Sequence, residues 1–351
     1  MSDLSKYCVS LKCSIREAFK QMDVGDKKFI LVVDDNDKVI GIVTDGDFRR
    51  AIWASVSFQD NIITIMNEDF VHASEDYEIE HLKKEFRKSK TLQQIPILKL
   101  GYLQNVIFRE DLTKHKRSLK KVDLPVVIMA GGTGTRLDPF TRILPKPLIP
   151  IGNKPMIEVI MDEYAKYGIK LFYVSVNHKA KIIKAFFEDF DKDYSISYLT
   201  EEEPYGTAGA LKFLDSKIKS PFFVSNCDII VFDDYAKIYE FHTKGRYDFT
   251  LIASVQHHTH PYGVCEIDNG GELKEIREKP EYDLLVNTGM YLVEPSILDL
   301  IPDDKFFDMT DLIKKIREKE LKIGVYPVSE KSWVDVGRWE EYEKALNSFK
   351  L

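Results

Sequence analysis

A glycine-rich stretch followed by two cations is the part of this sequence best suited to chemistry. It reads GGTGTRL from Gly131 to Leu137, and a second motif, Pro-Lys-Pro, centres on Lys146, ten residues after Arg136. Glycines let backbone N–H groups approach phosphate oxygens and form an anion-binding concavity. An arginine can bind phosphate oxygens with two parallel hydrogen bonds, and a lysine can place a point charge on a reacting phosphate. The spacing therefore predicts a loop that handles phosphates.

Two common phosphate-binding motifs do not account for this stretch. The P-loop motif, G-x-x-x-x-G-K-[S/T], needs a Lys-Ser or Lys-Thr pair, and none follows these glycines. The dinucleotide-binding motif, G-x-G-x-x-G, is satisfied by Gly132 and Gly134 but has Leu137 in place of its third glycine. The sequence therefore predicts a different kind of phosphate loop.

Strand-like and helix-like segments alternate around this loop. Residues 124–132 form a near-continuous apolar run, as expected of a strand covered on both faces. Residues 154–169 carry apolar side chains at helical spacing, with Gly168 as a helix stop. The pattern continues as strand, helix, strand over 170–200, and a buried strand over 221–230 ends in polar residues. We predict an α/β fold with a doubly wound, mostly parallel, Rossmann-like sheet that binds ligands outside the carboxyl ends of its strands.

The composition narrows the class of protein. A chain of 351 residues with 44% apolar and 30% charged residues is typical of a folded protein of two or three domains. Its net charge of −7 argues against nucleic-acid binding, which needs a basic surface. The four cysteines show no C-x-x-C spacing, the N-terminus has no apolar signal region, and no apolar run approaches the ~20 residues that span a bilayer. We expect a reduced, cytoplasmic protein with neither nucleic acid nor a membrane as partner.

The first third of the chain contains an internal repeat. A shift of 64 positions places Ile15 on Ile79 and Asp47 on Asp111, and each copy shows a helix-like stretch followed by two strand-like stretches. The sequence GIVTDGDFRRAI, which begins at Gly41, resembles the end of a CBS motif, the unit that pairs into a Bateman module. In that family a Thr-x-x-Asp element commonly holds the ribose and phosphates of adenosine nucleotides.

The first copy keeps this element as Thr44 and Asp47, whereas the second copy has Phe108 and Asp111. The resemblance therefore implies one regulatory nucleotide site per chain, and association of chains into a homo-oligomer through these domains. A purely structural module is the alternative. The predicted boundaries are tandem CBS domains over 1–118 (about 1–58 and 59–118), a basic, polar linker over 119–123, and a catalytic domain over 124–351.

Residues 124–351 closely resemble the sugar nucleotidyltransferases, also called nucleotidyl-diphosphate-sugar pyrophosphorylases. Later motifs follow in that family's order: EEEPYGTAGAL from Glu201, SNCD ending at Asp228, PYGVCEI from Pro261, EKP from Glu278, VNTGMY from Val286 and WVDVG from Trp333. These enzymes join a sugar 1-phosphate to a nucleoside triphosphate and release pyrophosphate. A regulatory protein with an inactive transferase domain is the competing class, but Lys146 and both family aspartates, Asp228 and Asp335, are present.

The resemblance implies a role for each matching residue. Asp228 and Asp335 would bind Mg²⁺, which prefers few protein ligands and keeps waters. A helix N-cap and a turn aspartate are the respective alternatives. The remaining roles are Arg136 and Lys146 for catalysis; Gly131, Gly132, Gly134, Thr135, Glu201, Gly206 and Thr207 for nucleotide binding; and Gly263, Glu278, Lys279, Asn287 and Thr288 for the sugar phosphate. For Glu278 with Lys279 the alternative is a solvated charge pair, and for Asn287 with Thr288 it is a strand-end turn.

The base and the sugar can be argued separately. Guanine offers two donors, N1–H and the N2 amino group, and a carboxylate accepts both. Thymidylyl relatives have a glutamine where this chain has Glu201, so we predict GTP as the nucleotide; the alternative is that Glu201 is one of three exposed glutamates. A CBS pair ahead of a guanylyltransferase resembles the glucosamine-1-phosphate guanylyltransferases of legionaminic acid biosynthesis, which favours glucosamine 1-phosphate. Mannose-1-phosphate and heptose-1-phosphate guanylyltransferases are the alternatives.

One position departs from the family pattern. Cys227 stands beside Asp228, where many relatives have glycine. Cysteine is small, so we expect the activity to tolerate it. A redox-sensing role would need a depressed thiol pKa.

Overall fold

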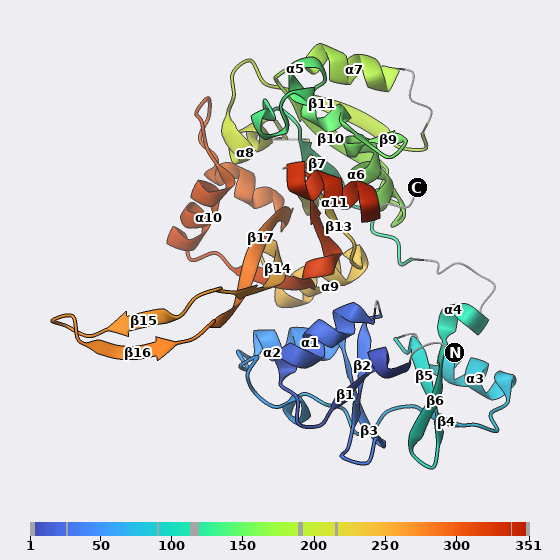
Figure 1. Cartoon of the computed structure of the whole chain (residues 1–351). Helices are drawn as coiled ribbons and strands as arrows, with labels where there is room; N and C mark the ends of the chain where they lie inside the picture. Colours follow the sequence, from blue (N-terminus) through green and yellow to red (C-terminus); the bar gives the residue numbers. More distant parts are fainter. Residues whose placement is uncertain are drawn as a thin grey trace. The chain divides into compact units, whose positions relative to one another are not determined.

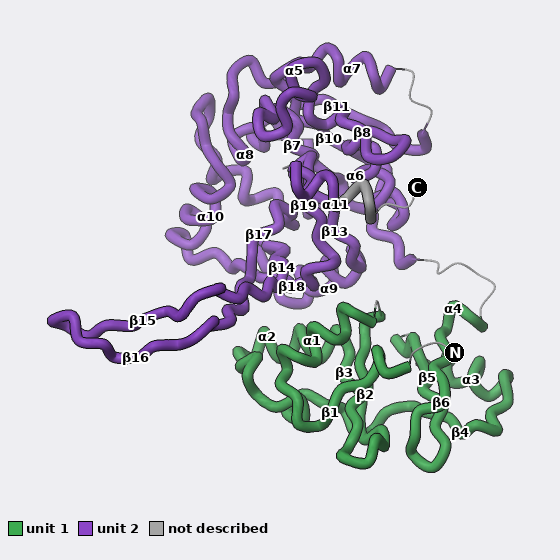
Figure 2. The backbone as a smooth tube through the Cα atoms, viewed as in Figure 1, with its two compact units in different colours: residues 1–118 green, residues 119–351 purple. Residues whose placement is uncertain are grey.

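The computed structural model describes residues 4–25, 27–89, 91–112, 119–188, 192–214, 217–337 and 339–348. The chain folds into two compact units, Met1–Ser118 and Leu119–Leu351 (Figure 2). The predicted linker, 119–123, lies within the described residues, whereas 113–118 before it does not. Val122 is buried and its N–H donates to the Tyr167 carbonyl at 2.8 Å, so this part of the predicted linker is packed on the C-terminal unit.

The N-terminal unit contains two copies of one small α/β arrangement. Each copy has a three-stranded sheet with one parallel and one antiparallel pair, ordered β1-β2-β3 and β4-β5-β6. Helices α1 and α3 begin at Ile15 and Ile79, and α2 and α4 begin at Asp45 and Arg109, so both helix starts are 64 positions apart. The elements are η1 (Leu4–Tyr7), β1 (Cys8–Ser10), α1 (Ile15–Val24), β2 (Phe29–Val33), β3 (Val39–Thr44), α2 (Asp45–Trp53), η2 (Ile62–Thr64), β4 (Ala73–Ser74), α3 (Ile79–Lys88), β5 (Gln94–Lys99), β6 (Tyr102–Phe108) and α4 (Arg109–Leu112).

The two copies share one apolar core. Leu31 and Ile42 of the first copy belong to the same buried cluster as Leu98 and Val106 of the second. A three-stranded sheet alone buries little apolar surface, so burial of these side chains between the two copies stabilises the pair as a unit.

The C-terminal unit is built on a seven-stranded sheet (Figure 1). Its order is β11-β10-β7-β12-β17-β14-β18, and of these strands β17 alone runs antiparallel to its neighbours. The predicted α/β fold with a mostly parallel sheet is therefore confirmed. The strands are β7 (Val126–Met129), β10 (Leu171–Val176), β11 (Ser195–Thr200), β12 (Phe222–Asn226), β14 (Phe249–Thr259), β17 (Glu281–Val293) and β18 (Ile323–Ser329).

Both faces of this sheet are covered. Val126 and Ile128 of β7 pack into one core with helices α6 and α9, while Val127 between them packs into a second core with η5 and α10. Burying an aliphatic side chain stabilises the fold by about 1.5–3 kcal/mol, so a strand buried on both faces reads as an unbroken apolar run. The covering elements are α6 (Met156–Ala165), α7 (Ala180–Glu188) and α9 (Tyr235–Gly245) for the first core and η5 (Ala210–Leu214), η6 (Pro295–Leu300) and α10 (Met309–Glu318) for the second.

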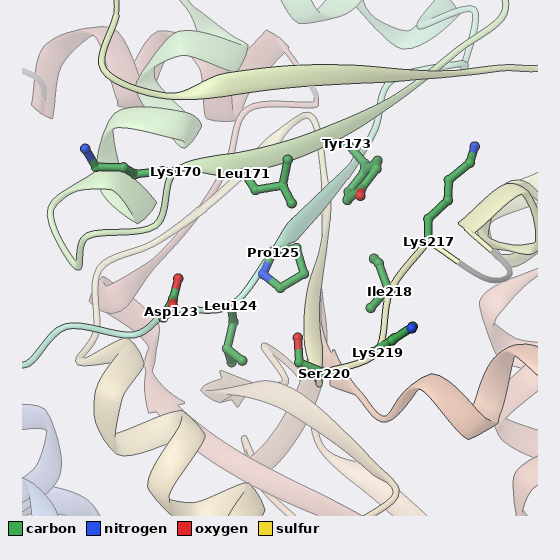
Figure 3. A pocket seen from close by; sticks show the side chains of 10 residues that line it. All are labelled: Asp123, Leu124, Pro125, Lys170, Leu171, Tyr173, Lys217, Ile218, Lys219 and Ser220. Carbon is green, nitrogen blue, oxygen red and sulfur yellow. The ribbon is translucent and has the colours of Figure 1, made fainter.

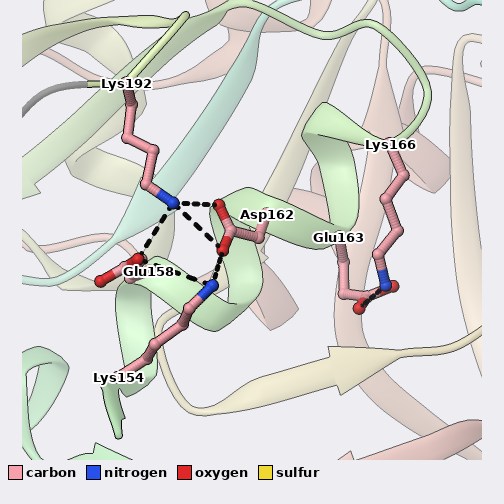
Figure 4. A network of polar contacts seen from close by, with 6 residues as sticks. All are labelled: Lys154, Glu158, Asp162, Glu163, Lys166 and Lys192. Carbon is pink, nitrogen blue, oxygen red and sulfur yellow. Dashed lines mark hydrogen bonds and ion pairs between the residues drawn. The ribbon is translucent and has the colours of Figure 1, made fainter.

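An ion-pair network fixes one end of α6 (Figure 4). The buried Glu158 and its neighbour Asp162 lie between two lysines. Lys154 contacts Asp162 at 2.6 Å, and Lys192 contacts Glu158 at 3.1 Å and Asp162 at 3.2 Å. A buried carboxylate is tolerated when it is paired in this way, and the network ties Lys192, in the segment that leads into β11, to α6.

Short elements connect the large sheet to the loops at its edges. They are η3 (Thr135–Leu137), α5 (Phe140–Ile143), η4 (Lys146–Leu148), β8 (Pro150–Ile151), β9 (Lys154–Pro155), α8 (Gly206–Gly209), β13 (Ile229–Val231), η7 (Glu330–Ser332), β19 (Trp333–Asp335) and α11 (Trp339–Ser348). Within the described part of the chain, no helix has the length and apolar character that a membrane crossing requires.

A two-stranded arm, residues 260–280, extends from the ends of β14 and β17 (Figure 1). It consists of β15 (Val264–Ile267) and β16 (Leu273–Arg277). One of its faces is apolar. Cys265 pairs with Ile276 on this face, and Ile267, two positions further along β15, pairs with Leu273. The side chains of Ile267, Leu273 and Ile276 are 59–67% exposed. Glu266 faces the other way and forms an ion pair with Arg277.

Candidate active site

The predicted phosphate loop follows β7 at the carboxyl edge of the sheet. Gly134 has a φ of +71°, which favours glycine, and a Cβ there would lie 2.8 Å from the Lys146 Cβ and 3.0 Å from Thr141 Cγ2. The loop therefore wraps closely over Lys146. Gly132 has no atom within 4 Å of an added Cβ, and Thr135 is exposed, so both leave space for a ligand.

Lys146 and the two family aspartates come together from separate parts of the chain. Lys146 and Asp228 are both only 8% exposed and form an ion pair. Strands β13 and β19 pair so that Ile229 lies opposite Asp335, and the Val336 N–H donates to the Asp228 carbonyl at 2.8 Å. This pairing holds the two carboxylates at the same edge of the sheet.

Gly337 marks the point on which these side chains converge. A Cβ added to it would lie 2.5 Å from Asp228 Oδ2, 2.9 Å from Asp335 Oδ1 and 3.3 Å from Lys146 Nζ. Glycine is therefore required here to keep the space between the two carboxylates open. We call Lys146, Asp228, Asp335 and Gly337 the phosphate centre.

The phosphate centre fits a Mg²⁺ ion that is completed by substrate. Among the described residues no group of three or more His, Cys, Asp and Glu side chains could hold a metal by itself. Two carboxylates beside an open cradle instead suit Mg²⁺, which takes one or two protein ligands and fills its octahedron with water and phosphate oxygens.

Electrostatics at Asp335 favour a nearby cation. Burial raises the pKa of the Asp335 carboxyl above its usual range, and the charge of Asp228 adds to that effect. The Gly337 N–H, which donates to Asp335 Oδ1 at 2.7 Å, and the charges of Lys146 and Arg136 lower it. A buried carboxylate beside a second carboxylate is stabilised in its charged form when a divalent cation lies next to both.

Arg136 is available for a ligand. Its side chain is exposed, and within the described residues it makes no hydrogen bond or ion pair. Its charge nevertheless reaches Asp335, which places it near the phosphate centre. An unpaired guanidinium beside a phosphate loop is suited to bidentate binding of phosphate oxygens.

Glu201 is buried, and not one of three exposed glutamates. It is 7% exposed, whereas Glu202 and Glu203 lie at the surface. Its Oε1 accepts a hydrogen bond from the Ser175 hydroxyl, and its Oε2 accepts one from the Tyr205 N–H at 3.1 Å. A Cβ at Gly131 would lie 2.8 Å from Oε1, so the carboxylate is next to the phosphate loop.

Gly206 and Thr207 begin the short helix α8, which together with Tyr205 we call the turn at 205–209, and both residues also have structural contacts. Gly206 has a φ of +80°, and a Cβ there would lie 2.7 Å from the Phe307 carbonyl oxygen. The Thr207 hydroxyl donates to Asp308 at 3.1 Å and accepts from the Met309 N–H at 2.9 Å. The hydroxyl is thus occupied within the protein, and the nucleotide contact assigned to Thr207 stays a prediction.

Three predicted sugar-phosphate residues lie on the arm. A Cβ at Gly263 would lie 2.8 Å from Glu278 Oε2, so these two residues are neighbours across the hairpin. Lys279 is exposed with a φ of +45°. Across the described ranges, no hydrogen bond or ion pair joins Glu278 to Lys279 or either of them to the phosphate centre. The structure therefore does not bring these residues together with Lys146, and their sugar role stays a prediction.

Asn287 and Thr288 behave differently although they are adjacent. Asn287 is exposed, and its amide bonds the Tyr291 hydroxyl at 2.8 Å and the Gly289 N–H at 3.0 Å. Thr288 is 2% exposed, and its hydroxyl donates to the Ile252 carbonyl at 2.8 Å and accepts from Met290 N–H at 3.2 Å. Thr288 lies inside β17, where the register with β14 shifts, so it is not in a strand-end turn. Its hydroxyl is bonded within the sheet, and the sugar contact assigned to it stays a prediction.

Two residues beside the site were not predicted from the sequence. Asn226 ends β12, and a Cβ at Gly289 would lie 2.5 Å from its Nδ2, so Asn226 packs against β17 next to Asn287. The Ser175 hydroxyl donates a hydrogen bond to Glu201 Oε1. The sequence contained one usable signal, a polar residue at or next to the carboxyl end of the apolar strands β10 and β12.

Cys227 is not suited to redox sensing. It is buried, and burial together with the charge of Asp228 raises its pKa to about 12. The thiolate is the reactive form, so this thiol is inert at neutral pH. The redox interpretation is wrong, and Cys227 acts as a small packing residue.

In the N-terminal unit, Thr44 and Asp47 cap a helix. The Thr44 hydroxyl and N–H both donate to Asp47 Oδ2, at 2.6 and 2.8 Å, and Asp47 also pairs with Arg50. In the second copy, Asp111 accepts from the Phe108 N–H at 3.1 Å. Both aspartates therefore have a local structural role, and a nucleotide contact at Thr44 and Asp47 stays a prediction.

The ring of Phe108 occupies the corresponding place in the second copy. It lies 6.1 Å from the rings of Tyr7 and Phe29, and the Lys27 ammonium lies 4.5 Å from its centre. An aromatic cluster thus fills this side of the module.

A pocket of about 300 Å³ lies at the opposite edge of the sheet, where β7, β10 and β12 begin (Figure 3). It is lined by residues 123–125, 170–171, 173 and 217–220. Figure 3 shows the amino groups of Lys170 and Lys217 on opposite sides of it, directed apart. The pocket therefore provides no converging cations for a phosphate, in contrast to the carboxyl edge.

The architecture and the phosphate centre together define an α/β protein whose glycine loop and converging charged groups lie where the strand order reverses beside β7, the usual ligand position in such sheets. The profile of the family described as nucleotidyl transferase matches residues 125–350, and that of the CBS domain matches residues 2–54. The chain belongs to the nucleotidyl transferase family and carries an N-terminal CBS domain.

Relatives and solved structures agree with this assignment. A mannose-1-phosphate guanyltransferase from Yarrowia lipolytica is 32% identical over 225 residues, which cover 62% of this chain and 61% of that protein. The chain thus spans about three fifths of that relative's length. The crystal structure of HddC from Yersinia pseudotuberculosis has a TM-score of 0.52 at 28% identity and covers 65% of this chain and 100% of its own. A second HddC structure, complexed with GMP-PN, has a TM-score of 0.51 at 28% identity, covering 65% of this chain and 100% of that one.

Proposed function

We propose that this protein transfers GMP from GTP to a sugar 1-phosphate and releases pyrophosphate. The observation that carries the proposal is the convergence of Lys146, Asp228 and Asp335 around Gly337 at the carboxyl edge of the sheet. The relatives support the same reaction, because one is named as a guanyltransferase of a sugar 1-phosphate and one structure holds GMP-PN.

The reaction is an in-line exchange of phosphorus–oxygen bonds. An oxygen of the sugar phosphate attacks the α-phosphorus of the nucleotide, one P–O bond forms, and the bond to pyrophosphate breaks. No covalent intermediate on the protein is required, so catalysis depends on positioning and on charge stabilisation.

Each residue near the loop then has a distinct task. Lys146 supplies a buried cation next to the α-phosphate, and Arg136 binds the leaving phosphates with its exposed guanidinium. Asp228 and Asp335 would hold Mg²⁺, which when bound neutralises negative charge on the reacting phosphates. The N–H groups of the loop from Gly131 to Thr135 bind the triphosphate.

Glu201 selects the base. Its buried carboxylate sits beside the phosphate loop with its two oxygens oriented by Ser175 and Tyr205, and each oxygen retains capacity for a further donor. Guanine supplies the two donors that such a carboxylate needs, whereas uracil and thymine supply one donor and one acceptor.

The sugar is assigned with the help of the relatives. Glucosamine 1-phosphate follows from the domain order alone, whereas mannose 1-phosphate is the substrate in the names of the matched guanyltransferases. We therefore place mannose 1-phosphate first, with heptose 1-phosphate and glucosamine 1-phosphate as the other candidates.

The N-terminal module is assigned a regulatory role. A single adenosine-nucleotide site at Thr44 and Asp47 is favoured over two because the Phe108 ring packs in an aromatic cluster in the second copy. Pairing of these modules between chains would produce a homo-oligomer.

The test is pyrophosphate release by the full chain with each of four nucleoside triphosphates and each of the three sugar 1-phosphates, with and without Mg²⁺. We expect activity with GTP and Mg²⁺ and a strong preference for one sugar. A preference for UTP or dTTP would overturn the assignment of Glu201, and no activity with any pair would overturn the reaction itself.

A further inference from the structure

The turn at residues 205–209, which follows Glu201, is held by a segment near the start of α10. The Phe307 N–H donates to the Tyr205 carbonyl at 2.8 Å, and the Phe307 carbonyl accepts from two N–H groups of the turn at 2.9 and 3.0 Å. A Cβ at Gly206 would approach the same carbonyl oxygen to 2.7 Å. The turn is therefore moulded against this segment along its backbone.

Asp308 adds a side-chain clamp to these backbone contacts. Its Oδ1 accepts from the Thr207 N–H at 3.0 Å and from the Thr207 hydroxyl at 3.1 Å, and this pair is 101 residues apart in sequence. One carboxylate oxygen thus fixes both the backbone and the side chain of the turn.

The Asp308 side chain bonds the turn in place of the N-cap hydrogen bond within its own helix. It occupies the N-cap of α10, where an aspartate ordinarily accepts from an N–H of its own first turn, but it makes no such bond. The Thr207 hydroxyl serves the Met309 N–H instead, at 2.9 Å. The Asp308 carboxylate thus bonds the turn, and the Thr207 hydroxyl of the turn bonds the first N–H of α10. The position of the turn therefore depends on α10.

The clamped turn in turn orients the base-reading carboxylate. The Tyr205 N–H, at the start of the turn, donates to Glu201 Oε2 at 3.1 Å. A continuous chain of contacts therefore runs from Asp308 through Thr207 and Tyr205 to Glu201.

We propose that Asp308 is a positioning residue for recognition of the nucleotide base. It holds the turn at 205–209 so that Glu201 presents its oxygens to the base, and it does not touch the nucleotide itself. The inference rests on the proposed function, in which Glu201 binds guanine.

The experiment compares three variants of the full chain. Asp308→Ala removes the clamp, Asp308→Asn retains an amide oxygen that can accept from Thr207, and Asp311→Ala serves as the matched control. Asp311 lies in the same first turn of α10 and pairs with the exposed Lys314 at 3.0 Å, away from the turn at 205–209. Each variant is measured for KM and kcat with both substrates, for GTP binding by calorimetry without sugar phosphate, and for Tm.

We expect Asp308→Ala to raise KM for GTP and weaken GTP binding about tenfold, with kcat and the KM for sugar phosphate little changed. Asp308→Asn should recover most of the loss, and Asp311→Ala should change Tm alone. Unchanged GTP binding in Asp308→Ala, or an equal loss in Asp311→Ala, would overturn the positioning role and leave Asp308 as a structural contact to Thr207.

The outcomes also separate this inference from the proposed function. If the wild-type chain prefers another nucleotide, the guanine assignment fails, and a higher KM of Asp308→Ala for that nucleotide still supports the clamp. If the wild-type chain transfers no nucleotide, the proposed function and the clamp fail together.

Discussion

The phosphate centre and the arm are built in opposite ways. Lys146, Asp228 and Asp335 reach one place from three distant segments, and the first two are almost fully buried. Glu278 and Lys279 lie instead on a local hairpin with exposed strands, anchored where the His260 N–H meets the Pro280 carbonyl at 2.9 Å. The first region is fixed by the whole sheet, and the second by its own two strands.

This difference matches the tasks assigned to the two regions. Charge stabilisation at a reacting phosphorus needs groups that do not rearrange during the reaction, and a doubly covered sheet provides them. Recognition of a sugar needs shape and hydroxyl contacts, which a peripheral hairpin can supply without disturbing the sheet. We therefore expect damage to the phosphate centre to abolish turnover, and damage to the arm to change substrate affinity.

The largest expected effect follows from removing one charge of the phosphate centre. Asp228→Asn or Asp335→Asn should lower kcat by roughly 10²-fold or more, because the cation that neutralises the reacting phosphates loses a ligand. Pyrophosphate release at saturating substrates and Mg²⁺ measures it. Asp193→Asn is the control, since Asp193 pairs with Lys170 in an exposed ion pair. Near-normal kcat in both aspartate variants would remove the proposed metal site.

A somewhat smaller effect should follow from filling the cradle without removing a charge. Gly337→Ala places a methyl group 2.5 Å from Asp228 Oδ2, so the carboxylates must move apart. We expect the Mg²⁺ concentration for half-maximal activity to rise about tenfold or more, in line with other changes around metal ligands. Titration of activity with Mg²⁺ and with Mn²⁺ measures it. If both curves coincide with those of the wild type, the space beside Gly337 is not the ion site.

The arm should give a weaker and more selective effect. Lys279→Ala should raise KM for the sugar phosphate about tenfold, because one charge-assisted contact is lost, and leave KM for GTP as it was. Lys274→Ala is the matched control, because Lys274 lies on the same arm and forms a surface ion pair with Glu266 at 3.8 Å. A fall in kcat with KM unchanged would place Lys279 with the phosphate centre and break the division between the regions.

The smallest effect concerns the sheet that supports both regions. His242 is fully buried between Thr250 and Glu294, and burial lowers its pKa although Glu294 opposes this. The unfolded chain therefore binds a proton here more readily, so the free energy of unfolding falls as the pH drops below about 6.5. Urea unfolding between pH 5 and 7.5 should show this slope, and His242→Gln should flatten it. An identical slope in the variant would assign the pH dependence to other groups.

The phosphate centre could be anticipated from the sequence because its residues stand in short, recognisable motifs. Gly134 and Lys146 come after the apolar strand β7, and Asp228 comes after the apolar strand β12. Parallel strands bring their carboxyl ends to one edge of a sheet, so the sequence indicates that these residues lie near one another. The tasks of Thr288 and Thr207 could not be read in the same way. Their hydroxyls are bound by Ile252 and Asp308, and such partners become visible only when the chain is folded.

The role proposed for Asp308 could not be predicted from the sequence either. In the sequence it is an ordinary helix-capping residue ahead of an amphipathic helix. Its link to Thr207 joins residues 101 positions apart, and no local pattern encodes a contact of that range.

The arm joins the sheet only through β14 and β17, and this gives it a degree of evolutionary independence. Residues 260–280 can be exchanged for the hairpin of a relative while the buried carboxylates and the glycine loop keep their sequence. If the arm has the proposed sugar role, a lineage can change its sugar substrate by substitutions confined to this hairpin, with the residues of the phosphate centre unchanged.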